Sequence, residues 1–203
     1  LLMIAPVLPN GLKIDVMPPF YSKPYVMMTL NLMKKFGIKY DLSEDSISIN
    51  NQEYKSGSYK VESDWSAASY WYSFISINKK LKEIKLKGLR EHSLQGDQVI
   101  KKIMTLFNVE TLYDKDGIIL RKKDFDCDYL ELDFKDCPDL AQTVLVVAAF
   151  HKVKLKLYGV ESLKIKETDR LKAMSNELKK IGVNFYDDNG VWTLDKRNNE
   201  FSN

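Results

Sequence analysis

The sequence repeats one order of predicted elements about every 70 residues: strand, helix, strand, helix, strand, strand. Three equivalent helices are expected to end at Gly37, Asn108 and Gly182, which lie 71 and 74 residues apart. Asp64 and Asp136 begin equivalent helices 72 residues apart. A repeat of this length indicates that one supersecondary unit is used several times. The alternation of strands and helices predicts an α/β fold.

The elements expected in each unit follow from the hydrophobic spacing and the turn residues. Residues 1–5 are expected to be the last turns of a helix that Pro6 stops. The first unit follows and lacks its leading half. It has a strand at 12–16, a helix from Pro24 to Gly37, and strands at 38–42 and 46–50. The second has strands at 59–62, 81–86, 109–112 and 118–120, and helices led by 64–69 and 93–97. The third has strands at 129–132, 154–157, 183–186 and 191–194, and helices led by 136–139 and 166–170.

Composition narrows the class of protein. Of the 203 residues 44% are hydrophobic and 11% aromatic, which is typical of a globular chain with a core. The net charge of +3 is too small to indicate a nucleic-acid partner. Cys127 and Cys137 lack metal-site spacing and are expected to be reduced thiols in a cytosolic protein, and His92 and His151 are isolated. No apolar run is long enough to cross a bilayer, and both ends look cut, so we expect a fragment of a longer protein.

The stretch from Lys166 to Arg170 holds two cations and two carboxylates within five residues. It leads into an amphipathic helix whose apolar face is Leu171, Met174, Leu178 and Ile181. The N-terminal end of a helix is partially positive and suits an anion, so cations there are disfavoured unless an anionic partner offsets them. The stretch therefore predicts an anion-binding site.

Polar residues also stand at the starts of other helices. Ser22-Lys23 and Ser93 to Asp97 hold the position equivalent to Lys166–Arg170, and capping explains the serines and acids there. Asp64 and Ser66 are read as caps. Asp136 and Asp139, which bracket Pro138, fit capping and function about equally well.

Five strings carry a resemblance to a known family: Ser22-Lys23-Pro24-Tyr25, Val61 to Ser69, Gln95-Gly96-Asp97, Cys137-Pro138-Asp139, and Lys166 to Leu171. In this order and spacing they resemble the 5-enolpyruvylshikimate-3-phosphate synthase family, over essentially the whole chain. The related UDP-N-acetylglucosamine enolpyruvyltransferases share the fold, but the first and last strings look like the shikimate enzymes.

The resemblance implies a two-domain enolpyruvyltransferase-like fold, incomplete here, with three repeats per domain and helix N-termini facing a cleft. Residues 1–60 would be the last, truncated repeat of the first domain. Residues 61–127 and 128–203 would be two repeats of the second, and the chain would cross between domains near Tyr59 to Glu62.

The family reaction transfers the enolpyruvyl group of phosphoenolpyruvate to the 5-hydroxyl of shikimate 3-phosphate and releases phosphate. The resemblance implies that Ser22, Tyr25, Ser162, Lys166 and Asp139 contact shikimate 3-phosphate. Ser162 stands where many members carry Asn, and Ser63 and Ala67 also depart from the usual pattern.

The same resemblance assigns catalysis to three residues. Asp139 would be the base that takes the hydroxyl proton, Lys166 would share in proton transfer, and Glu167 would handle the proton at the methylene carbon. Arg170 would clamp the phosphoenolpyruvate anion, with Glu167 beside it. Flanking cations favour an ionised Glu167, whereas desolvation on closure would raise its pKa, so its protonation state stays open.

We expect no cofactor and no metal, no nucleic-acid or membrane partner, and a monomer when the protein is full length. The family's remaining cationic motifs lie outside these 203 residues, so the chain alone is expected to be inactive. Two alternatives remain: a UDP-sugar enolpyruvyltransferase, and a non-catalytic or RNA-end-processing protein built on the same repeat.

Overall fold

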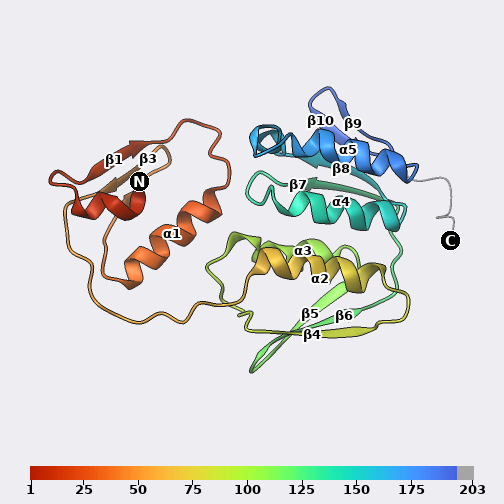
Figure 1. The fold of residues 1–203 in the computed structure, drawn as a ribbon, viewed down its shortest axis with the longest axis horizontal. Coiled ribbons are helices and arrows are strands. Elements are labelled where there is room, and N and C mark those ends of the chain that lie inside the picture. Colours follow the sequence, from red (N-terminus) through yellow and green to blue (C-terminus); the bar gives the residue numbers. More distant parts are fainter. Residues whose placement is uncertain (196–203) are drawn as a thin grey trace. The chain divides into compact units, whose positions relative to one another are not determined.

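The computed structural model describes residues 1–195, which form two compact units (Figure 1). The first comprises residues 1–61 and 94–96, and the second comprises residues 62–93 and the described residues from Asp97 on. Each unit has its own hydrophobic core.

The first unit packs one helix and a short 3₁₀ turn against a small antiparallel sheet. Its elements are η1 (Leu2–Val7), β1 (Leu12–Asp15), α1 (Lys23–Lys35), β2 (Asp41–Leu42) and β3 (Ser46–Ile49), with sheet order β1-β3-β2. The core residues alternate along β3 and recur along α1, as the two periods require. They are Ala5, Leu30, Met33, Ile38, Ile47 and Ile49.

Two predictions for this unit are corrected. Pro6 does not stop a helix but lies inside η1, and the turn continues past it with a hydrogen bond of 3.2 Å from the Leu8 N–H to the Ala5 carbonyl. The strand expected at 38–42 shortens to β2. The Gln52 side chain bonds both the N–H and the carbonyl of Lys39 and so occupies the positions of a ladder partner.

The second unit contains two sheets and the helices that cover them. Its elements are α2 (Trp65–Ile77), β4 (Glu83–Lys87), η2 (Gly96–Val99), α3 (Ile100–Thr105), β5 (Val109–Asp114), β6 (Gly117–Lys122), β7 (Tyr129–Asp133), α4 (Leu140–Phe150), β8 (Lys154–Tyr158), η3 (Glu161–Ile165), α5 (Arg170–Lys180), β9 (Phe185–Asp188) and β10 (Val191–Leu194). Figure 1 shows α2 and α4 side by side. Both are strongly apolar, and their facing residues form much of the core.

The repeat is confirmed by sheet topology. The orders β1-β3-β2, β4-β6-β5 and β8-β10-β9 are the same, with the last strand of each unit in the middle. In the third repeat β7 adds in parallel to the edge at β8, and α4 makes the crossover between them. The fold is therefore α/β, as predicted.

The strand predicted at 59–62 is wrong, since this segment has no regular structure. Leu130 and Leu132 of its counterpart β7 pack against the core, whereas Val61 is 79% exposed. The segment is also where the chain passes from the first unit to the second. A strand without a buried face has little to hold it in a sheet.

The predicted helix ends are confirmed, because Gly37, Asn108 and Gly182 all adopt positive φ, at 87°, 54° and 74°. The helix led by 93–97 begins later than expected, as η2 followed by the short α3.

None of the helices within residues 1–195 combines the length and apolar character that a bilayer crossing needs. The same residues contain no group of three His, Cys, Asp or Glu side chains arranged to hold a metal ion.

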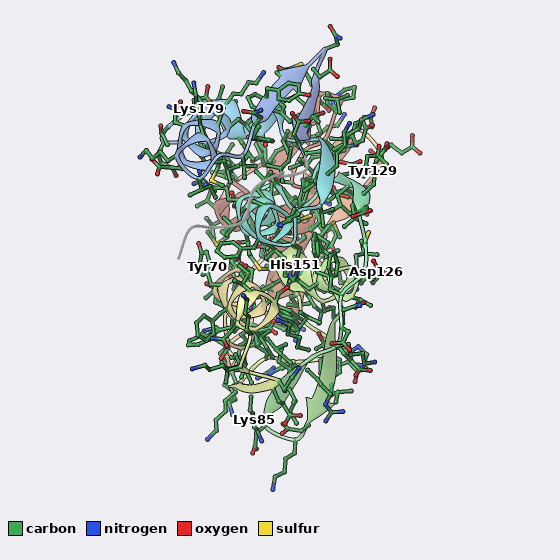
Figure 2. The ribbon with its side chains drawn as sticks, turned by 90° about the vertical axis from the view of Figure 1, so that its right-hand side faces the viewer. Tyr70, Lys85, Asp126, Tyr129, His151 and Lys179 are labelled. Atoms are coloured by element: carbon green, nitrogen blue, oxygen red, sulfur yellow. The ribbon has the colours of Figure 1, made fainter. Side chains whose placement is uncertain are left out.

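The far ends of α2 and α4 meet at a half-buried histidine. His151 (Figure 2) follows α4, and its Nε2 lies 2.9 Å from Ser76 Oγ in the last turn of α2. The Phe125 ring packs on the imidazole with centroids 4.5 Å apart. Burial first, and then the charge of Lys122, holds the pKa of His151 below its usual range.

Candidate active site

The charged stretch before α5 is positioned by a cap and by two buried leucines. Asp169 is the N-cap, and its carboxylate accepts a hydrogen bond of 3.0 Å from the Lys172 N–H. Leu171 and Leu178 are buried, whereas Ile181 lies just beyond the helix and is partly exposed. One of the two carboxylates of the stretch is thus used as a cap, and Lys166, Glu167 and Arg170 remain for other partners.

Arg170 joins two carboxylates from the segments that precede α4 and α5. Its Nη1 donates to Asp139 Oδ1 at 2.8 Å, and its Nη2 donates to Glu167 Oε2 at 2.8 Å. Lys166 Nζ lies 3.8 Å from the same Asp139 oxygen. The Arg170 side chain is 24% exposed and that of Glu167 is 80% exposed, so the cluster opens to solvent on the glutamate side. Two cations and two carboxylates therefore meet at the starts of α4 and α5.

Asp139 is not a capping residue. It holds the N-cap position of α4, but its backbone is already helical, at φ −67° and ψ −20°, and its side chain makes no capping bond within the described part of the chain. The preceding turn takes over that task, because the N–H groups of Leu140 and Ala141 bond the carbonyls of Cys137 and Pro138 at 3.1 Å each. The carboxylate consequently points to Arg170, and the capping interpretation of Asp139 is wrong.

Glu167 is held in its ionised form. A hydrogen bond from its own backbone N–H is the largest cause, and the Arg170 hydrogen bond and charge add to it, so the pKa of Glu167 lies below its usual range despite a small opposing effect of burial. In this state of the protein the backbone hydrogen bond and the pairing with Arg170 together outweigh the effect of burial on the pKa of Glu167.

Ser162 lies in η3, four residues before Lys166. Its Oγ is shielded from solvent and has no hydrogen-bond partner within residues 1–195. A buried hydroxyl normally has a partner, so this oxygen has capacity to bond a further group. The position is compatible with the predicted ligand contact.

Ser22 and Tyr25 belong to the first unit, whereas the other predicted site residues belong to the second. Ser22 precedes α1 with φ 57° and ψ 27°, and within the described chain its side chain makes no capping bond. The Tyr25 N–H bonds the Ser22 carbonyl at 3.0 Å. A left-handed serine is uncommon and costs backbone energy. Because no capping bond within the described chain offsets this cost, capping does not account for Ser22.

Comparison with known proteins identifies the family. A family model described as EPSP synthase (3-phosphoshikimate 1-carboxyvinyltransferase) matches residues 1–198. The chain belongs to this family.

Relatives agree with this EPSP synthase assignment. A 3-phosphoshikimate 1-carboxyvinyltransferase of Bacteroides fragilis is 43% identical over 190 residues, which are 93% of this chain and 46% of that protein. One from Buchnera aphidicola is 37% identical over 193 residues, again 93% of this chain and 44% of that protein. The chain thus spans about half the length of the curated relatives it matches.

Solved structures share the fold. The EPSP synthase of Acinetobacter baumannii superposes with a TM-score of 0.70 at 18% identity, covering 99% of this chain and 46% of that one. The enolpyruvyl transferase NikO of Streptomyces tendae gives a TM-score of 0.57 at 11% identity, covering 96% and 44%. The predicted enolpyruvyltransferase-like fold is confirmed.

One residue of the charged cluster around Arg170 was not among the sequence-predicted site residues. Gln142 Oε1 accepts a long hydrogen bond, 3.5 Å, from Arg170 Nη1. Gln142 lies three residues after Asp139, so the two share one face of α4, and this spacing could have predicted a common partner. A single neutral side chain in an apolar helix does not by itself indicate a site.

Proposed function

We propose that the chain forms part of the active site of a 3-phosphoshikimate 1-carboxyvinyltransferase. The enzyme transfers the enolpyruvyl group of phosphoenolpyruvate to the 5-hydroxyl of shikimate 3-phosphate and releases phosphate, a step of the shikimate pathway to aromatic amino acids. One observation carries this proposal. Arg170 is bonded at 2.8 Å to both Asp139 and Glu167, with Lys166 3.8 Å from Asp139, so candidate anion binders and proton-transfer groups converge.

The cluster supplies the parts that the phosphoenolpyruvate half of the reaction requires. Arg170 binds the phosphoenolpyruvate anion, because a planar guanidinium offers paired donors to a carboxylate or phosphate. Glu167 then donates a proton to the methylene carbon of phosphoenolpyruvate. When an anion takes Arg170, Glu167 loses a charge partner that holds its pKa down, and its pKa moves toward the range of a proton donor.

The second half of the reaction is the attack of the hydroxyl. Asp139 takes the proton of the 5-hydroxyl as the hydroxyl oxygen bonds the substituted carbon of the enolpyruvyl group. The tetrahedral intermediate then expels phosphate while its methyl carbon returns a proton to Glu167, which restores the double bond. Lys166 binds the phosphate of shikimate 3-phosphate and shares in proton transfer. Cations here also offset the charge that develops on the departing phosphate.

Ser22, Tyr25 and Ser162 are proposed as further contacts of shikimate 3-phosphate. A ligand role for both serines is supported by the left-handed backbone of Ser22 and by the shielded Ser162 hydroxyl, which has no hydrogen-bond partner among residues 1–195. We also propose that residues 1–60 belong to one catalytic domain and 61–127 and 128–203 to the other, and that the full-length enzyme is a cytosolic monomer.

A chimera tests the function. The matching 190-residue stretch of the Bacteroides fragilis relative is replaced by that of this chain, and phosphate release is measured with both substrates. We expect turnover with shikimate 3-phosphate as acceptor and none with UDP-N-acetylglucosamine. A folded chimera that uses the UDP-sugar, or neither acceptor, contradicts the proposal. The 203-residue chain alone is expected to release no phosphate, since it spans about half of its relatives.

A further inference from the structure

Asp97 is the one carboxylate that is almost fully buried within residues 1–195, at 1% exposed. It lies in η2, outside the charged cluster around Arg170. Burying a charge is costly unless hydrogen bonds compensate, so an acid in this place calls for a physical reason. Ser66 Oγ, in the first turn of α2, donates to Asp97 Oδ2.

The Ser66 contact anchors the first turn of α2, and Ser69 in the same turn reaches α4. The Ser69 hydroxyl donates to the Ser66 carbonyl at 2.6 Å, and Ser69 Oγ lies 3.2 Å from Thr143 Oγ1. A hydroxyl has one proton to donate, so Thr143 must be the donor in this last contact. The Asp97–Ser66 and Ser69–Thr143 contacts are thus joined by the first turn of α2, whose backbone carbonyl at Ser66 takes the Ser69 proton.

The charge of Asp97 also reaches the turn that leads into α4. Cys137, two residues before Asp139, is buried, and its thiol pKa is raised to about 12, first by burial and next by the charge of Asp97. Thr143 follows Asp139 by four residues, which places the two on the same side of α4. The contact that holds Thr143 against α2 therefore also sets the direction in which Asp139 leaves the helix.

We propose that Asp97 is a positioning residue for Asp139: through Ser66, Ser69 and Thr143 it fixes the first turn of α4 against α2 and so directs the Asp139 carboxylate to Arg170. The structural part of this inference stands on the contacts alone. Its catalytic consequence rests on the proposed function.

The Arg170 guanidinium gives a direct readout in the ¹⁵N-labelled chain without substrate. Arg170→Lys identifies its side-chain N–H resonance by loss of the signal, and Asp139→Asn defines the position of that resonance when the pair is broken. We expect Asp97→Asn, which keeps shape but removes charge, to move the Arg170 signal toward the Asp139→Asn position. Ser66→Ala, which leaves Asp97 intact and breaks the link, should move it the same way, and it tests the proposal even where Asp97→Asn does not fold.

Ser76→Ala is the matched control. It removes a buried serine hydrogen bond, 2.9 Å to His151, at the opposite end of the same α2–α4 contact. We expect the Arg170 signal to stay at its parental position in this variant. A folded Asp97→Asn or Ser66→Ala chain with an unmoved Arg170 signal overturns the proposal, as does an equal shift in Ser76→Ala.

The active chimera adds a separate arm. There Asp97→Asn and Ser66→Ala should lower kcat by roughly 10- to 100-fold, the effect of misplacing a reacting group by about 1 Å, with little change in KM for phosphoenolpyruvate. A change in KM alone overturns the catalytic part. An inactive chimera contradicts the proposed function but leaves the Arg170 readout decisive for the positioning role.

Discussion

Asp139→Asn is expected to tighten anion binding while it slows catalysis. In the unliganded protein the Asp139 carboxylate occupies Arg170 at 2.8 Å and lies 3.8 Å from Lys166. An incoming phosphate must compete with it for the same donors. Replacing the carboxylate with a neutral amide of the same shape removes both the competitor and its repulsion of the anion.

The size of the effect follows from the geometry. Two unit charges at the Asp139–Arg170 distance attract by about 1.5 kcal/mol at the dielectric constant of water. Because the Asp139 side chain is 36% exposed, solvent screening argues against a larger value. About 1.4 kcal/mol is tenfold in affinity. We therefore expect Asp139→Asn to lower the Kd for inorganic phosphate about tenfold, and to lower kcat in the chimera.

Titration of the chain with phosphate, followed by ³¹P NMR at an ionic strength of about 0.1 M, where the Debye length is about 10 Å, measures the affinity. Glu177→Gln is the control, since it removes one carboxylate from α5 that is paired with Lys180 at 2.7 Å. Seven residues of helix place it about 10 Å along the axis from Arg170, a distance over which salt screens exposed charges. An unchanged or weaker affinity in Asp139→Asn, or an equal gain in Glu177→Gln, refutes the reasoning.

Three further outcomes follow from the fold. Because the pKa of His151 is depressed in the folded chain, the unfolded chain takes up a proton at a pH at which the folded chain does not. The free energy of unfolding should therefore fall as the pH drops from about 7 to 5. In urea melts, His151→Gln should flatten this dependence. Asp64→Ala should cost about 1 kcal/mol of unfolding free energy and Asp64→Asn far less, since the carboxylate caps α2 through the Ser66 N–H; equal losses in urea melts would contradict this. Gly182→Ala should destabilise by about 1 kcal/mol, because φ is 74° although no atom of the described residues lies within 4 Å of an added Cβ. A stabilised variant in the same assay would contradict the left-handed stop.

The parts of the fold that local chemistry determines could be predicted from the sequence. The helix stops at Gly37, Asn108 and Gly182 depend on left-handed residues, and the strand pairs depend on alternation and turn residues, so both are visible in a short window. The strand expected at 59–62 failed because its apolar residue Val61 had no core to face, and burial is a property of the whole fold.

The candidate site likewise has a part that local sequence predicts and a part that depends on tertiary packing. The motif around Lys166–Arg170 was visible because cations at a helix start conflict with the helix dipole. The bonds from Arg170 to Asp139 and Gln142 join segments about 30 residues apart in sequence and depend on how α4 and α5 pack. Asp97 was noticed only as part of a motif, because its burial and its link to Ser66 are tertiary features.

The position of phosphoenolpyruvate in a crystal structure of the chain tests the central claim most directly. We predict the anion within hydrogen-bond distance of the Arg170 guanidinium, with Arg170 released from Asp139 or Glu167 and Lys166 nearby. Phosphoenolpyruvate bound elsewhere, or a saturated crystal in which Arg170 still holds both carboxylates at 2.8 Å, would contradict it.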